Sequence, residues 1–123
     1  MTFNIEPVLW YNTATVKSLD WLLIHGGEIK GGNPYSAIAA KVLSWHKALD
    51  EHFDYMAMGH FHHSLKICET YVNGCMITDD DWSRSVVGRD GECCQLLLAV
   101  SAKGIEAVMP IWLNDVGEDW EEL

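Results

Sequence analysis

The chain has 123 residues, a length that suits one compact domain with its own apolar core. Its 18 acidic and 8 basic side chains give a formal net charge of −10, which argues against a basic surface that tracks nucleic-acid backbones. A nucleotide or nucleic-acid substrate remains open, because bound divalent cations can reverse the local charge.

The N-terminal residues 1–11, MTFNIEPVLWY, lack the basic start of a secretory signal peptide, and no apolar run approaches the length of a membrane span. The four cysteines form no CxxC pair, so we expect them to be reduced, small apolar residues. They are Cys68, Cys75, Cys93 and Cys94. We therefore expect a soluble cytoplasmic protein with no membrane contact.

In the first half of the chain, 7–11 fit a short strand and 12–20 fit a turn or loop. The apolar run that begins at Trp21 and stops at two glycines predicts a buried strand. A helix is expected from Tyr35 to Glu51, with Asn33 as its N-cap and Pro34 in its first turn. Four apolar residues are spaced to share one face of that helix: Ile38, Val42, Trp45 and Leu49.

Strands are expected for most of the second half. The run 53–59 is a second buried strand, and 64–69 and 71–77 are short strands that can pair with each other. The segment 78–92, which contains Asp79, Asp80 and Asp81, is expected to be a solvated polar loop. Residues 93–100 and 105–113 are expected to form a hairpin around the turn 101–104.

The order strand–helix–strand predicts a parallel pair, to which the later strands are added antiparallel in the same sheet. We therefore expect an α/β fold with a mixed β-sheet and one main helix. The whole of 1–113 is expected to form a single domain, followed by an acidic tail at 114–123. The evenly apolar strands 93–100 and 105–113 are expected to be buried on both sides.

Three histidines stand in four consecutive positions, at His60, His62 and His63, and His25 follows the first buried strand. The carboxyl ends of parallel strands meet at one edge of a sheet, so His25 and His60 are expected to lie close together. A bend after Gly59 would bring His62 into the same pocket. Neutral imidazole suits zinc, iron, manganese and nickel, so these three histidines are a predicted metal site.

Three further residues are assigned to the surroundings of this site. Glu28 either orients the imidazole of His25 or is an exposed loop acid. His63 either supports a metal ligand or faces the substrate, or else it is a surface histidine. Asn73, followed by a glycine, fits a turn first and a residue beside the site second.

These motifs resemble those of calcineurin-like metallophosphoesterases. GHFHH (59–63) resembles the Gly-His-x-His signature of that family, and LLIHGGE (22–28) resembles its earlier strand-end His-Gly motif, with the acid one residue late. YVNGCMI (71–77) resembles the strand after the signature, with Cys75 in place of a serine. The order and spacing of the motifs agree with the family from Trp21 to Leu113, which is most of the chain. Within the family, the motifs most resemble those of phage-encoded and DNA-repair members. For a phage gene, the compartment would be the host cytoplasm.

The resemblance implies half of the family's α/β/β/α sandwich, the C-terminal half. The family site holds two metals about 3.5–4 Å apart, of which His25 and His60 would bind one and His62 the other. The family's N-terminal motifs, Asp-x-His, Gly-Asp and Gly-Asn-His, are absent here. The bridging aspartate, the asparagine ligand and the catalytic histidine therefore have no counterpart.

Three functions follow as alternatives. The first is a metal-dependent hydrolase of phosphomonoesters or phosphodiesters, which needs a partner chain with the N-terminal motifs or a homo-oligomer that covers the open sheet face. The second is a non-catalytic binding or assembly module derived from the same fold. The third is a mononuclear zinc hydrolase that acts alone.

Overall fold

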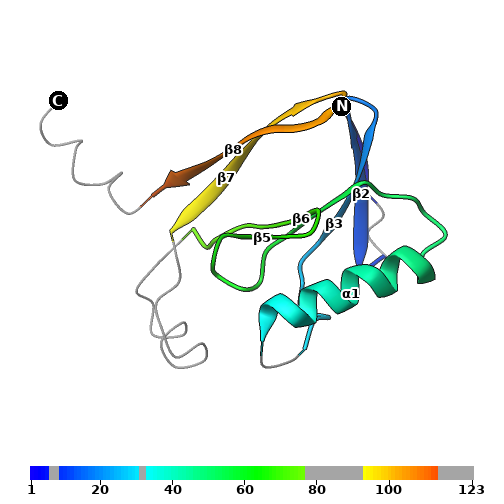
Figure 1. The fold of residues 1–123 in the computed structure, drawn as a ribbon, viewed down its shortest axis with the longest axis horizontal. Coiled ribbons are helices and arrows are strands. Elements are labelled where there is room, and N and C mark those ends of the chain that lie inside the picture. Colours follow the sequence, from blue (N-terminus) through cyan, green and yellow to red (C-terminus); the bar gives the residue numbers. More distant parts are fainter. Residues whose placement is uncertain (6–8, 31–32, 77–92, 114–123) are drawn as a thin grey trace, which may run out of the picture.

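The computed structural model describes residues 1–5, 9–30, 33–76 and 93–113. The expected polar loop with Asp79, Asp80 and Asp81, the acidic tail and residues 7–8 of the first expected strand lie outside the described residues. The elements are β1 (Thr2–Asn4), β2 (Tyr11–Val16), β3 (Leu19–Ile24), α1 (Pro34–Ala48), β4 (Tyr55–Met58), β5 (Leu65–Ile67), β6 (Thr70–Val72), β7 (Cys94–Ser101) and β8 (Gly104–Trp112) (Figure 1).

Six of the strands form one mixed sheet in the order β1-β2-β3-β4-β6-β5. β3 and β4 run parallel, with Ile24 opposite Met58, which confirms the parallel pair expected on either side of the helix. β4 and β6 are also parallel, and β5 pairs antiparallel with β6, as their sequence pattern predicted. The expected fold class, an α/β chain with a mixed sheet and one main helix, is confirmed.

The prediction of a turn or loop over 12–20 was wrong, because β2 and β3 form an antiparallel hairpin with Tyr11 opposite Ile24. The two connecting residues, Lys17 and Ser18, have φ values of 53° and 66°. Two consecutive residues with positive φ are characteristic of a type I′ turn, whose twist suits a tight hairpin. The order Asn-Thr-Ala-Thr offers no strongly apolar alternation, so the strand gave little signal in the sequence.

Helix α1 starts as predicted and ends earlier. The Asn33 side chain accepts a hydrogen bond from the Tyr35 amide at 2.9 Å, which caps the first turn. Leu49 has already left the helix, with φ −87° and ψ 135°, although its amide still donates to the Trp45 carbonyl. The helix therefore ends at Ala48 rather than at Glu51.

The two faces of the six-stranded sheet carry separate apolar clusters. Leu22, Ile24 and Met56 pack against the buried face of α1. The alternate residues of the same strands, such as Trp21, point to the opposite face, where Ala14 and Tyr71 join them. Helix α1 and the β7–β8 hairpin lie on opposite sides of this sheet (Figure 1).

The hairpin of β7 and β8 is confirmed, but its expected addition to the main sheet was wrong. The two strands form their own sheet, which folds over the second face of the six-stranded sheet. The side chains that pack inward are Leu96, Leu98, Val100 and Ile105. Cys75, just after β6, forms an isolated parallel bridge with Cys93, so the hairpin begins beside the end of the main sheet.

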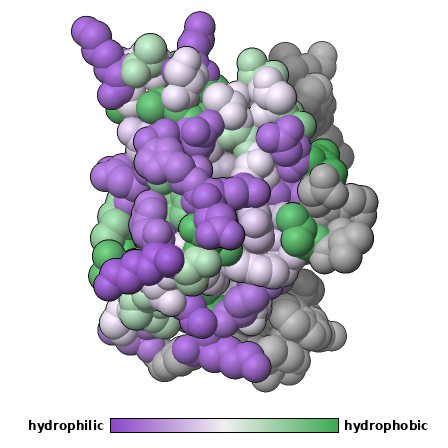
Figure 2. Space-filling model, turned by 90° about the vertical axis from the view of Figure 1, so that its right-hand side faces the viewer, coloured by the Kyte–Doolittle hydropathy of each residue, from purple (hydrophilic) through white to green (hydrophobic). Residues whose placement is uncertain are grey.

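The expected burial of these strands on both sides depends on a partner that covers their outer face, and in the chain alone this face is exposed. Leu97, Met109 and Ile111 on the outer face of the hairpin are 49%, 50% and 45% exposed. On the face of the molecule that Figure 2 shows, hydrophobic side chains are scattered among hydrophilic ones. Within the described residues no helix is long and apolar enough to cross a membrane.

Candidate metal centre

The parallel register of β3 and β4 brings two histidines together. β3 ends at Ile24 and β4 ends at Met58, so His25 and Gly59 leave the sheet at the same level. The Gly59 amide donates to the His25 carbonyl at 3.2 Å, which extends the pairing by one residue. As a result, His25 Nε2 lies 3.2 Å from His60 Nδ1, and the two rings meet edge to face with centroids 5.0 Å apart.

The backbone around this pair is tightly bent. His60 and His62 have φ values of 72° and 59°, in the left-handed region that costs a non-glycine residue about 1 kcal/mol or more. Gly26, with φ 104°, lies so close that a Cβ there would stand 3.2 Å from the His60 Cβ. Residues in strained conformations cluster at functional sites, and two of them here are histidines.

The surroundings of His60 favour its neutral imidazole. Burial lowers the pKa of His60 below its ordinary value of 6.5, and the nearby His25 and His62 lower this pKa further, while Glu28 raises it. His62 and Glu28 therefore both lie within electrostatic range of His60. Because a metal binds the deprotonated nitrogen, a lowered pKa prepares His60 for coordination near neutral pH.

The distance between the two nitrogens suits a shared metal. Two nitrogens bound to one zinc at about 2.0–2.1 Å with tetrahedral angles would stand roughly 3.3–3.4 Å apart, close to the 3.2 Å between His25 and His60. The same distance also suits an N–H···N hydrogen bond between neutral rings. Across the described ranges, no group of three or more His, Cys, Asp or Glu side chains is arranged to hold a metal ion. The described residues therefore supply two ligands of a metal site rather than a complete set.

The other predicted site residues have different surroundings. Glu28 is exposed, whereas His62 and His63 are half-buried. The thiol of Cys75 lies 3.9 Å from the His62 carbonyl oxygen, which places the segment after β6 against the histidine loop.

Asn73 connects the two sheets. Its Oδ1 accepts from the Leu96 amide at 2.8 Å, and its Nδ2 donates to the Gln95 side chain. Gln95 in turn donates to the carbonyl oxygens of Gly74 and Cys75 at 3.2 and 3.3 Å. Gln95 was not singled out from the sequence, where a glutamine beside three leucines was the only signal.

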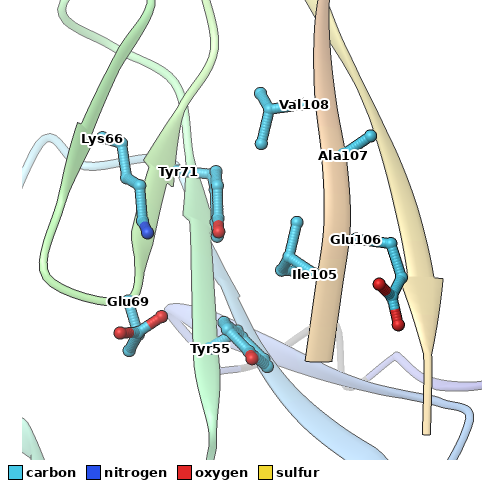
Figure 3. Close-up of a pocket in the computed structure, with 8 residues that line it drawn as sticks. All are labelled: Tyr55, Lys66, Glu69, Tyr71, Ile105, Glu106, Ala107 and Val108. Atoms are coloured by element: carbon cyan, nitrogen blue, oxygen red, sulfur yellow. The ribbon is translucent and has the colours of Figure 1, made fainter. Parts of the chain in front are cut away.

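A separate hollow of about 280 Å³ lies between β5, β6 and β8 (Figure 3). Ile105 and Val108 face Tyr71 across it, and Lys66 lies 5.5 Å from the centre of the Tyr71 ring. No histidine lines this hollow. The hollow and the histidine pair are therefore different places on the molecule.

Two solved structures of Vps29 from Entamoeba histolytica resemble this chain. The wild-type protein, crystallised with zinc, matches with a TM-score of 0.58 and 12% identity over 89% of this chain and 63% of that one. A single-mutant form matches with a TM-score of 0.57 and 12% identity over 90% and 64%. No family description and no curated protein matches the sequence.

At this identity the likeness shows the fold alone. Vps29 has the calcineurin-like metallophosphoesterase fold, and this chain has the same fold at partial coverage. The chain spans less than two thirds of the length of either Vps29 chain that it matches.

Proposed function

We propose that this chain is a metal-binding part of a metallophosphoesterase-type domain, with His25, His60 and His62 as its metal ligands. The observation that carries the proposal is the 3.2 Å separation of His25 Nε2 and His60 Nδ1 at the carboxyl ends of two parallel strands. Ligand sites of open α/β sheets lie at this kind of edge. The zinc in one Vps29 structure supports a divalent metal, and manganese, iron and nickel suit the same ligands.

The chain's own residues would bind and orient the metal. His25 and His60 present one nitrogen each, and His62 lies within electrostatic range of His60. A bound divalent ion would polarise a phosphate oxygen and lower the pKa of water, which is the chemistry that phosphoester hydrolysis needs. Glu28, which is exposed and within electrostatic range of His60, raises the pKa of that imidazole.

Phosphoesterase activity would require more ligands than the chain supplies. Two-metal hydrolysis uses one ion on each side of the transferred group, and the described residues offer no three-ligand cluster. We propose that a partner chain with the Asp-x-His and Gly-Asn-His motifs completes the site. The substrate class would be phosphomonoesters or phosphodiesters, including nucleotides.

A second candidate is a non-catalytic assembly module with the same fold. It is favoured by the exposed apolar face of β7–β8, because contiguous exposed apolar side chains mark interaction surfaces. In that case the histidine pair would be a remnant of the fold's metal site.

Metal binding tests the proposal directly. Titration calorimetry with Zn²⁺ and Mn²⁺ is expected to show binding to the native chain and at least tenfold weaker binding to His25→Ala and His60→Ala. His52→Ala is the matched control and should bind metal normally, because this exposed histidine precedes β4, whereas His60 follows it. Equal affinity in all four proteins would refute the metal site.

Hydrolysis of bis-p-nitrophenyl phosphate with Mn²⁺ then separates the two candidate functions. The enzyme hypothesis predicts turnover when the chain is co-expressed with a chain that carries the missing motifs, and loss of turnover in His60→Ala. Metal binding without turnover in that complex would favour the assembly module.

A further inference from the structure

The β7–β8 hairpin covers the second face of the six-stranded sheet only in part. Beside β7 lies a hollow of about 260 Å³, whose walls are apolar side chains of β1 to β4 below and of β7 above. Phe3, Val16 and Leu23 are among the former, and Leu98 and Val100 are the latter. An apolar hollow between two sheets is the space that a further strand of the upper sheet would fill.

The edge of β7 above this hollow is open over part of its length. Near the start of the strand, Cys93 forms a backbone β-bridge with Cys75, and the Leu96 amide donates to the Asn73 side chain. This part of the edge is therefore already occupied. From Leu97 to Ser101, β7 pairs only with β8 among the residues that the structure describes. This stretch contains no proline and no charged residue, which are the usual protections of an edge strand.

The edge of β8, by contrast, is protected. Because the Leu96 amide points to Asn73 and away from β8, its antiparallel partner Pro110 also turns its nitrogen outward. Proline has no N–H group, and within sheets it is confined to edge strands and bulges. β8 also carries Glu106, so a strand would add to β7 rather than to β8.

We propose that a strand from a separate partner polypeptide pairs with β7 along Leu97–Ser101 and inserts alternate apolar side chains into the hollow. Its backbone would pair with the N–H and C=O groups of Leu98 and Val100 that point away from β8. Its apolar side chains would contact Phe3 and Leu23. The same partner would lie next to the exposed outer face of Leu97 and Met109. Strand addition of this kind gains affinity from backbone hydrogen bonds and specificity from alternate side chains.

Two observations favour a different polypeptide over a second copy of this chain. A twofold axis that paired β7 with its own copy would place both six-stranded sheets on the same side, where their β1–β3 regions would collide under the shared edge. A net charge of −10 on each copy also opposes self-association.

Amide hydrogen exchange on the full chain tests the open edge. The probe is a ten-residue peptide of alternating Val and Lys, which supplies an apolar strand face and a charge opposite to that of the chain. We expect Leu98 and Val100 amides to exchange rapidly in the chain alone, and about tenfold more slowly at a peptide concentration that occupies roughly nine chains in ten. A peptide N-methylated at every second residue, which cannot pair on one edge, should give no protection.

A matched pair of variants adds a second readout. Leu98→Lys places a charge in the hollow and should abolish peptide binding, whereas Val108→Lys, on the paired position of β8, should not. If Leu98→Lys does not fold, the N-methylated peptide alone decides. The inference is overturned if the peptide does not bind, if these two amides are already slow to exchange in the monomer, or if self-association protects them.

The inference shares with the proposed function only the existence of a partner chain. Its test uses neither metal nor activity, so a failure here leaves the histidine site standing, and loss of metal binding leaves the β7 edge unaffected.

Discussion

At the scale of single residues, Asp54 shows how one carboxylate connects the start of β3 with the approach to β4. Its Oδ2 accepts a hydrogen bond from the Asp20 amide at 2.8 Å, and its Oδ1 lies 3.1 Å from His52 Nε2. The Asp20 amide, more than His52, holds the pKa of Asp54 below its usual value of 3.8. Because the folded state lowers this pKa, the stabilisation is full above the unfolded pKa and is lost as the pH falls through the folded pKa.

We therefore expect Asp54→Asn to lower the free energy of unfolding at pH 7 by about 1–2 kcal/mol, since a charged acceptor is replaced by a neutral one. The difference from the native chain should shrink as the pH falls below about 4. Urea unfolding at pH 7 and pH 3 measures this, and His52→Ala reports the smaller share of the imidazole. An equal difference at both pH values would contradict the assignment.

The candidate site was only partly predictable from individual residues. His25 and His60 each follow a recognisable buried strand, and the parallel register of β3 and β4 brings the two residues together. The role of Asn73 could not be predicted, because its two partners, Gln95 and Leu96, reach it only when β7 folds back over the sheet. The residues next to Asn73 in the sequence do not indicate that β7 folds back over the sheet.

At the scale of elements, the start of α1 depends on one side chain. Asn33→Ala removes the acceptor for the Tyr35 amide and should lower stability by about 1 kcal/mol. Asn33→Asp keeps an acceptor at the N-cap and should retain the native stability. Thermal unfolding followed by circular dichroism compares the three proteins, and equal melting temperatures for Ala and Asn would show that the cap contributes nothing.

The β7–β8 hairpin is tied to the main sheet at Asn73. We expect Asn73→Ala to increase amide exchange throughout β7 and β8, because Leu96 and Gln95 lose their partner. Exchange in β3 and β4 should stay unchanged, which serves as the internal control. Uniformly faster exchange in both sheets would instead indicate a general loss of stability.

Element boundaries and partners were less predictable than element types. The helix and the β3 and β4 strands have apolar patterns with clear stops, and the structure confirms these elements. The leucine-rich run of β7 is compatible with extending the main sheet or with lying on its face, because both bury the same alternate residues. The choice depends on contacts with Trp21 and Tyr71, far away in sequence.

At the scale of the whole molecule, stability is concentrated between α1 and the six-stranded sheet. Ile38 is fully buried there, whereas Leu43 on the same helix is 64% exposed. Ile38→Ala is expected to cost about 2–5 kcal/mol through lost burial and a cavity, and Leu43→Ala about 0.5 kcal/mol or less. Chemical unfolding of the two variants measures both; similar losses would mean that the helix packs differently.

The backbone β-bridge between Cys75 and Cys93, which is not a disulfide, has a consequence for which segments of the chain can be replaced. The two ends of the segment 76–92 are anchored side by side, so the intervening stretch begins and returns at one point of the scaffold. A brief glycine-rich link should therefore be able to stand in for 77–92 without pulling β6 away from β7. For the same reason, a protease nick within that stretch should leave two pieces that still travel together on a gel-filtration column.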